Sequence, residues 1–209
     1  MPIYIGPNKA TGLFLGTREI TRVWKGTDLV YQKGSPGPTE WTLFDHGWVD
    51  GVSWSGNMLP RPQYTSLGTY DFSNVESDGF MRLSVASAAS YSQVNHNCHV
   101  CVSAPITVPS GATKLCVSVA QNRAAGDFMY QSVYLKFGLL TQNAVNSMDA
   151  ANGGQLSGFT EISSTAPATH VLTLDAGIAG QSFLPIVNMR RNARGNETGH
   201  LYIYKVWFE

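Results

Sequence analysis

Apolar and polar residues alternate with a period of two along much of the chain after residue 40. In segment 80–86, Met81, Leu83 and Val85 alternate with polar residues, and segments 114–121 and 133–140 show the same pattern. Because successive side chains of a β-strand point to opposite faces, this alternation predicts strands with one face in a core. The last nine residues are apolar at positions of both parities, which predicts a central strand buried on both faces.

Turn-forming segments such as Pro109-Ser110-Gly111 and Asn152-Gly153-Gly154 separate these apolar segments. A helical pattern is confined to residues 144–151, which amounts to one or two turns. About eight to ten strands spaced in this way predict an all-β fold. The body is expected to be an antiparallel β-sandwich of the jelly-roll, galactose-binding-like type.

A different pattern occupies the N-terminus, where a short motif recurs every ten residues. Ile3-Tyr4-Ile5-Gly6, Leu13-Phe14-Leu15-Gly16 and Val23-Trp24-Lys25-Gly26 each place a glycine after a short, mainly apolar segment. Glycine adopts the positive φ that many tight turns require, so each repeat is interpreted as a strand followed by a turn. The repeats therefore predict a small N-terminal β-meander.

The Gly- and Pro-rich segment Lys33-Gly34-Ser35-Pro36-Gly37-Pro38 has no hydrophobic periodicity. Such a segment is typical of a linker between domains. We therefore predict a repeat meander over residues 1–33, a linker over 34–39 and a β-sandwich over 40–209. A long loop within a single domain is the alternative.

Composition narrows the classes of function. Charged residues make up 13% of the chain, and 14 Lys and Arg balance 14 Asp and Glu. A chain without net charge lacks the basic footprint of a nucleic-acid-binding protein. The longest apolar segments have the length of strands, so we expect no membrane insertion. The first residues show no signal-peptide pattern, so we expect synthesis in a reducing cytoplasm.

The segment His96-Asn97-Cys98-His99-Val100-Cys101 contains four potential metal ligands. A Cys-x-x-Cys pair is a common half of a zinc site, but it needs a turn to bring both thiols together. Here the sequence continues as a strand, which would turn Cys98 and Cys101 to opposite faces. We therefore expect buried structural cysteines, no metal and no cofactor, with a zinc half-site as the alternative.

Acidic residues gather in two places, Asp45 and Asp50 around Trp48 and the group Asp71, Glu76 and Asp78. Paired carboxylates can hydrolyse glycosides, and loop acids can hold a structural calcium ion, but turn formation is the simpler interpretation. The chain contains no Gly-x-Ser-x-Gly motif, phosphate-binding loop or His-Glu-x-x-His motif. We expect that the protein is not an enzyme.

Two pairs of residues are candidates for binding a ligand. Trp48 and Trp54 lie in a Gly- and Ser-rich segment, which favours a loop that exposes an aromatic platform for a sugar ring. Arg190 and Arg191 lie in a basic segment interpreted as the hairpin tip between the last two strands, where they could hold a sugar or its carboxylate. The alternatives are core positions for the tryptophans and a solvated turn for the arginines.

The ten-residue repeats resemble the N-terminal repeats of tail and baseplate-associated proteins of bacteriophages and prophages. The segment 106–115 and the ending Ile203-Tyr204-Lys205-Val206-Trp207-Phe208-Glu209 are also similar to such proteins. The body resembles jelly-roll modules of the galactose-binding or carbohydrate-binding kind.

This resemblance implies a structural protein of the virion, made in the cytoplasm of a bacterial host. It also implies partners among other tail or baseplate subunits, a homo-oligomeric state and recognition of a host-surface glycan. The alternative is a carbohydrate-binding module of a bacterial surface or glycan-degrading system.

Overall fold

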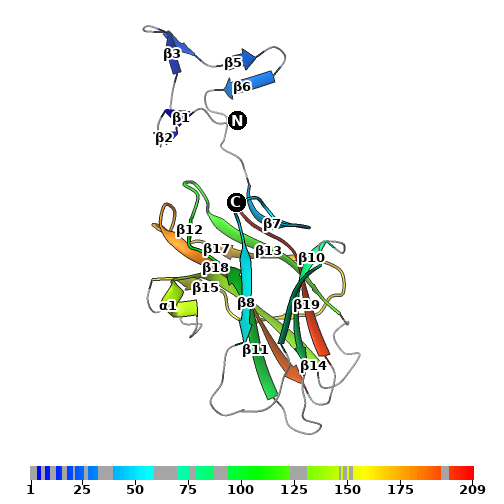
Figure 1. Ribbon diagram of the computed structural model, residues 1–209. Helices are drawn as coiled ribbons and strands as arrows, with labels where there is room; N and C mark the ends of the chain where they lie inside the picture. Colours follow the sequence, from blue (N-terminus) through cyan, green and yellow to red (C-terminus); the bar gives the residue numbers. More distant parts are fainter. Residues whose placement is uncertain are drawn as a thin grey trace. The chain divides into compact units, whose positions relative to one another are not determined.

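In a computed structural model, the chain divides into two compact units, residues 1–39 and residues 40–209 (Figure 1). The structure describes residues 4–5, 8–9, 13–15, 18–20, 22–25, 28–32, 40–58, 70–75, 79–86, 94–122, 131–145, 147, 150, 153–193 and 198–209. For the strands of the first unit and for residues 57–58, 70–75, 85–86, 94–97, 131, 192–193 and 198, the backbone alone is described.

Each ten-residue repeat of the first unit forms an antiparallel hairpin of two strands. The hairpins pair β1 (Tyr4–Ile5) with β2 (Asn8–Lys9), β3 (Leu13–Leu15) with β4 (Arg18–Ile20), and β5 (Arg22–Lys25) with β6 (Asp28–Gln32). The predicted β structure is present, but the expectation of one strand per repeat is wrong. The segment that follows the glycine of each repeat pairs back onto the segment that precedes it, so each repeat contains two strands.

The second unit is a sandwich of two antiparallel sheets. The first sheet has the order β17-β13-β19-β10-β9, and β7 also pairs with β19. Its strands are β7 (Trp41–Asp45), β9 (Tyr70–Val75), β10 (Phe80–Ala86), β13 (Lys114–Gln121), β17 (Ala168–Thr173) and β19 (Thr198–Phe208).

The second sheet has the order β15-β14-β18-β11-β8, with β12 paired to β18 and β16 paired to β14. Its strands are β8 (Trp54–Met58), β11 (Val94–Val102), β12 (Ile106–Thr107), β14 (Gln131–Leu140), β15 (Gln155–Leu156), β16 (Thr160–Ile162) and β18 (Ser182–Ala193). The described part holds more strands than predicted, because two- and three-residue strands leave no alternation in the sequence.

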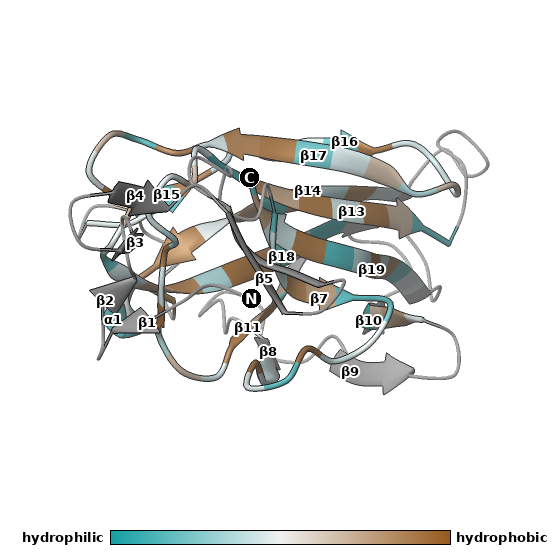
Figure 2. Ribbon diagram, turned by 90° about the horizontal axis from the view of Figure 1, so that it is seen from above, coloured by the Kyte–Doolittle hydropathy of each residue, from teal (hydrophilic) through white to brown (hydrophobic). Residues whose placement is uncertain are grey.

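The predicted all-β fold with an antiparallel jelly-roll sandwich is confirmed. Met81 and Leu83 of β10 and Leu115, Val117 and Val119 of β13 all lie in one buried cluster with the inward side chains of the second sheet. The C-terminal strand β19 is central, as predicted, with β13 on one side and β10 and β7 on the other. Figure 2 shows hydrophobic and hydrophilic residues alternating along the strands of both sheets.

A smaller apolar cluster lies on the outer face of the second sheet. Cys101, Leu184 and Ile186 pack there against Ala144 and Val145 of the short helix α1 (Gln142–Val145). Cys98 belongs to the core between the sheets, so the prediction that Cys98 and Cys101 face opposite sides is confirmed. The described residues include no helix that is long and apolar enough to cross a membrane.

Candidate functional site

Next to this smaller cluster, the outer face of the second sheet becomes polar. Backbone register places His99, Asn188 and Lys136 in one row across β11, β18 and β14. The adjacent row contains Arg190 of β18 and Tyr134 of β14. All five side chains point away from the core between the sheets, because their strand neighbours Cys98, Val187, Met189, Val133 and Leu135 point into it.

Four side chains of this face form a group that we call the cation–aromatic cluster: Tyr134, Lys136, Phe159 and Arg190. The Arg190 Cζ atom lies 5.3 Å from the centre of the Tyr134 ring and 5.0 Å from the centre of the Phe159 ring. The Lys136 Nζ atom lies 5.4 Å from the centre of the same Phe159 ring. These distances are those of cation–π contacts, and Phe159 remains 42% exposed.

Hydrogen bonds to β14 fix the segment that carries Phe159. The Ser157 N–H donates to the Phe137 carbonyl at 2.8 Å, and the Phe137 N–H donates to Ser157 Oγ at 2.9 Å. On the other side of Phe159, β16 begins at Thr160, which pairs with Leu135. The exposed ring is therefore carried by a backbone held at both ends, which limits the entropy lost when a ligand binds.

Two buried polar side chains adjoin the cluster. His99 is 2% exposed and Asn188 is 1% exposed. The Asn188 amide donates to the Cys98 carbonyl at 3.0 Å, but Asn188 Oδ1 and His99 Nδ1 have no hydrogen-bond partner in the described part of the chain. Burial lowers the pKa of His99, so its imidazole is neutral at pH 7.

The charges of this face are unbalanced. Its described charged side chains are Lys136, Arg190 and Glu161, and Glu161 is exposed in β16 at the position paired with Tyr134. Among the described residues, neither Lys136 nor Arg190 forms an ion pair with a carboxylate. Both side chains contact aromatic rings instead.

The structure places two of the predicted ligand-binding residues in the core. Trp54 is 7% exposed at the start of β8, and its indole N–H donates to the Leu43 carbonyl at 3.2 Å. Arg191 is fully buried and lies against Gly199. The expected loops are wrong at both positions, because β8 already begins at Trp54 and β18 extends to Ala193.

The other two predicted residues are accessible but separate. Arg190 is partly exposed in β18 rather than in a hairpin tip, and it belongs to the cation–aromatic cluster. Trp48 is 41% exposed between β7 and β8, and its ring packs edge-on against Phe44 with the centroids 5.9 Å apart. No contact joins Trp48 to Arg190 in the described part of the chain. The role of Trp48 in ligand binding therefore stays a prediction that is separate from the cation–aromatic cluster.

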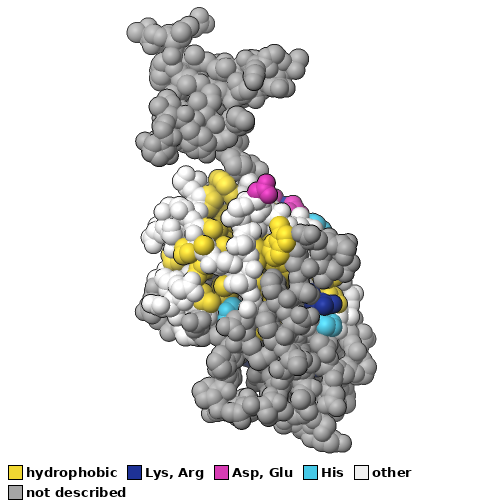
Figure 3. Space-filling view, viewed as in Figure 1, with side chains coloured by type: hydrophobic (Ala, Val, Ile, Leu, Met, Phe, Trp, Pro, Cys, Tyr) yellow, Lys and Arg dark blue, Asp and Glu magenta, His cyan; other side chains and the backbone are white. Residues whose placement is uncertain are grey.

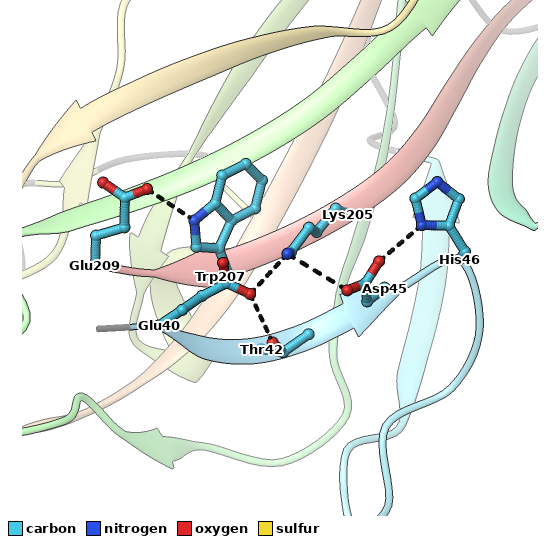
Figure 4. A network of polar contacts seen from close by, with 7 residues as sticks. All are labelled: Glu40, Thr42, Asp45, His46, Lys205, Trp207 and Glu209. Carbon is cyan, nitrogen blue, oxygen red and sulfur yellow. Dashed lines mark hydrogen bonds and ion pairs between the residues drawn. The ribbon is translucent and has the colours of Figure 1, made fainter. Parts of the chain in front are cut away.

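Asp45 of the first acidic group belongs to a structural network between β7 and β19, whereas Asp50 is exposed and lies outside it (Figure 4). Lys205 Nζ lies 2.7 Å from Glu40 Oε1 and 3.4 Å from Asp45 Oδ2, while His46 Nδ1 lies 2.7 Å from Asp45 Oδ1. The hydrogen bond to His46 and the positive charge of Lys205 lower the pKa of Asp45. The side chains of the second group, Asp71, Glu76 and Asp78, lie outside the described residues.

The three cysteines are buried thiols. Burial raises the pKa of Cys98 to about 12, that of Cys116 to about 11, and that of Cys101 as well. Within the described ranges, no three His, Cys, Asp or Glu side chains gather in a group that could hold a metal ion.

Three of the four cluster residues are not among the ligand-binding residues predicted from the sequence. Tyr134 and Lys136 occupy the polar parity of the alternating segment 133–140, and that parity marks them as outward-facing. Phe159 follows a glycine in an irregular segment, and nothing in the local pattern connects it with Arg190.

Charged side chains are sparse over the coloured surface of the body in Figure 3, in agreement with the low charge content.

No family model and no curated protein matches the chain. Solved structures do show a similar architecture. A carbohydrate-binding module described for the promiscuous specificity of its β-sandwich superfamily has 11% identity and a TM-score of 0.47, covering 87% of this chain and 66% of that chain. The family 11 carbohydrate-binding module of Clostridium thermocellum, bound to a mixed-linked tetrasaccharide, has 9% identity and a TM-score of 0.43, covering 81% and 94%.

A third similar structure is the Endo-D glycoside hydrolase domain of Streptococcus pneumoniae. It has 14% identity and a TM-score of 0.40, and the match covers 76% of this chain and 21% of that chain. Several of the similar structures are thus carbohydrate-binding modules. At these identities and scores, the likeness assigns no ligand and no site residue to this chain.

Proposed function

We propose that the protein binds carbohydrate on the cation–aromatic cluster. The observation that carries this proposal is the exposed Phe159 ring, held beside Tyr134 and the N–H donors of Arg190 and Lys136 on the face of a sheet. The apolar face of a sugar ring packs on an aromatic ring, while its hydroxyl groups take hydrogen bonds from adjacent donors. A rigid sheet face with both kinds of group fits such a ligand.

The proposed role is binding without catalysis. Glycoside hydrolysis by the usual route needs two carboxyl groups that flank the scissile bond. Among the described residues of this face, Glu161 supplies one carboxylate and no second one accompanies it.

The role in a phage or prophage tail rests on the N-terminal repeats and stays a proposal. In it, the repeat hairpins attach the protein to other tail or baseplate subunits in the virion, and the sandwich meets the host-surface glycan. Several copies on one particle would raise the overall affinity of a weak site by multivalency. A carbohydrate-binding module of a bacterial surface or glycan-degrading system would use the same face.

A glycan array probed with the full chain tests the proposal, followed by titration of the best ligand against Phe159→Ala. Loss of the stacking contact is expected to weaken binding by about tenfold, since about 1.4 kcal/mol corresponds to that factor. The matched control is Val171→Ala, which removes a 52% exposed apolar side chain from β17 of the other sheet.

The variants also separate this face from the Trp48 loop. Unchanged melting temperatures with binding lost only in Phe159→Ala support the cluster. Binding that survives Phe159→Ala and disappears in Trp48→Ala assigns the platform to the loop instead. An array on which the full chain binds no glycan contradicts the proposed function.

A further inference from the structure

We infer that the glycan bound by the cation–aromatic cluster is acidic, with a carboxylate or phosphate group held by Arg190 and Lys136. This inference rests on the proposed function and adds the chemical class of the ligand.

The pairing of the other lysines in the body shows what is unusual about these two cations. Lys114 Nζ lies 3.1 Å from Glu209 Oε2, and Lys205 lies close to both Glu40 and Asp45. Lys136 and Arg190 have no such carboxylate within the described residues, although both lie over the same Phe159 ring. Two adjacent cations repel each other, and an anion from outside the chain would remove that repulsion.

The contacts of Arg190 leave its hydrogen-bonding capacity open. Its guanidinium carbon lies over two aromatic rings, and cation–π contacts consume no N–H donor. Arg190 Nε is buried without an acceptor in the described part of the chain. A planar fork of N–H donors matches the oxygens of a carboxylate or a phosphate, and a hydrogen bond to an ionised acceptor is about twice as strong as a neutral one.

The rest of the face limits the charge of the site without cancelling it. Glu161 is an exposed carboxylate in β16, separated from Arg190 in β18 by the intervening strand β14. It repels an anionic ligand, and the surrounding solvent weakens that repulsion. His99, in the row beside Arg190, is neutral because burial lowers its pKa. The described charges of the face therefore sum to a net positive value, in a chain whose 14 basic and 14 acidic residues balance.

The test is a calorimetric titration of the full chain with oligogalacturonate and, as the uncharged match, with the same oligosaccharide fully methyl-esterified. A glycerol-phosphate teichoic acid forms a second arm, which distinguishes phosphate from carboxylate as the source of the anion. We expect an acidic probe to bind at least about tenfold more tightly than the neutral one. Raising NaCl from about 50 mM to about 500 mM should weaken the acidic probe and leave the neutral one unchanged.

Three variants assign the effect to residues. Lys136→Gln should reduce the affinity for the acidic probe by about tenfold while sparing the neutral probe, and Glu161→Gln should increase it. The control Lys114→Gln removes a half-exposed lysine of the other sheet and should change neither affinity. The salt dependence of the unmodified protein keeps the inference testable where a variant does not fold.

The outcomes separate the inference from the proposed function. Equal binding of acidic and neutral probes, with no effect of salt, overturns the inference and leaves the carbohydrate-binding role in place. Preference for the acidic probe that persists in Lys136→Gln but is lost in Lys114→Gln also overturns it. Binding of no glycan at all overturns both.

Discussion

Cys98 lies in the core between the two sheets, where burial raises the pKa of its thiol to about 12. In the unfolded chain the thiol ionises near its ordinary value of 9.0. Above that value the unfolded state binds fewer protons than the folded state, so stability falls as the pH rises. Between about pH 8 and about pH 10, Cys98 should contribute about 1 kcal/mol to this loss.

Urea unfolding of the unmodified protein and of Cys98→Val at both pH values measures that contribution. The variant has no thiol at this position, so its alkaline loss of stability should be smaller by the same amount. An identical loss in both proteins would show that Cys98 ionises as easily in the folded state as in the unfolded one.

Trp48, which lies between β7 and β8, and Trp54, the first residue of β8, should differ sharply in their contribution to stability. Trp54→Ala removes a buried indole and its hydrogen bond to the Leu43 carbonyl, which should cost about 3–5 kcal/mol. Trp48→Ala removes a ring that is 41% exposed and should cost less than about 1 kcal/mol. Denaturant unfolding of both variants checks the contrast, and equal losses would contradict the assignment of Trp54 alone to the core.

At the scale of elements, β15 lies so close to β14 that the position facing it must be glycine. A Cβ atom on Gly138 would overlap the backbone of Gln155, whereas a Cβ on Gly158 would meet no atom within 4 Å. Gly138→Ala should therefore destabilise the protein by about 1–3 kcal/mol, with Gly158→Ala as the near-neutral control. The segment that contains β15 also carries Phe159, so the affinity for glycan should fall in Gly138→Ala. Unchanged stability and unchanged affinity would show that β15 moves away from β14 without a cost in free energy.

The attachment of β7 to β19 should depend on pH because Lys205 in β19 pairs with the ionised carboxylate of Asp45 in β7. The lowered pKa of Asp45 means that its stabilising effect is complete above the ordinary value of 3.8 and is lost as the pH falls below it. Lys205→Met should cost about 1 kcal/mol or less at pH 7, since the Asp45 side chain is 42% exposed. Near pH 2 the variant and the unmodified protein should converge, and a constant difference in unfolding free energy would assign the effect to packing instead.

For the whole molecule, the division into two units predicts that the sandwich folds alone. The described members of the core cluster lie between residues 43 and 208, and residues 40–209 form a compact unit by themselves. A fragment covering residues 40–209 should unfold cooperatively and melt within a few degrees of the full chain in calorimetry. A fragment that binds a hydrophobic dye and lacks a transition would show that the N-terminal unit is required for the fold.

The sequence by itself determined the class of the fold and the inward faces of the long strands. Alternation in segments 80–86 and 114–121 requires a strand with one buried face. The same two-residue period places Cys98 and Cys101, which are three positions apart, on opposite faces of their strand. The doubly apolar C-terminus predicts a central strand, and β19 lies at the centre of its sheet, but the predicted burial on both faces is incomplete because Tyr202 and Tyr204 are only half-buried. These features depend on neighbouring residues and on the period of a strand, so a local pattern is sufficient.

The tertiary structure alone decided where strands begin and end and which outward residues meet. Trp48 and Trp54 have similar Gly- and Ser-rich neighbours, yet only Trp54 pairs with β11 and enters the core. Phe159 reaches Arg190 because β16 and β18 both pair with β14, although 31 residues separate the two positions. Pairing between strands distant in sequence depends on the packing of the whole sandwich, and local hydrophobic periodicity does not encode it.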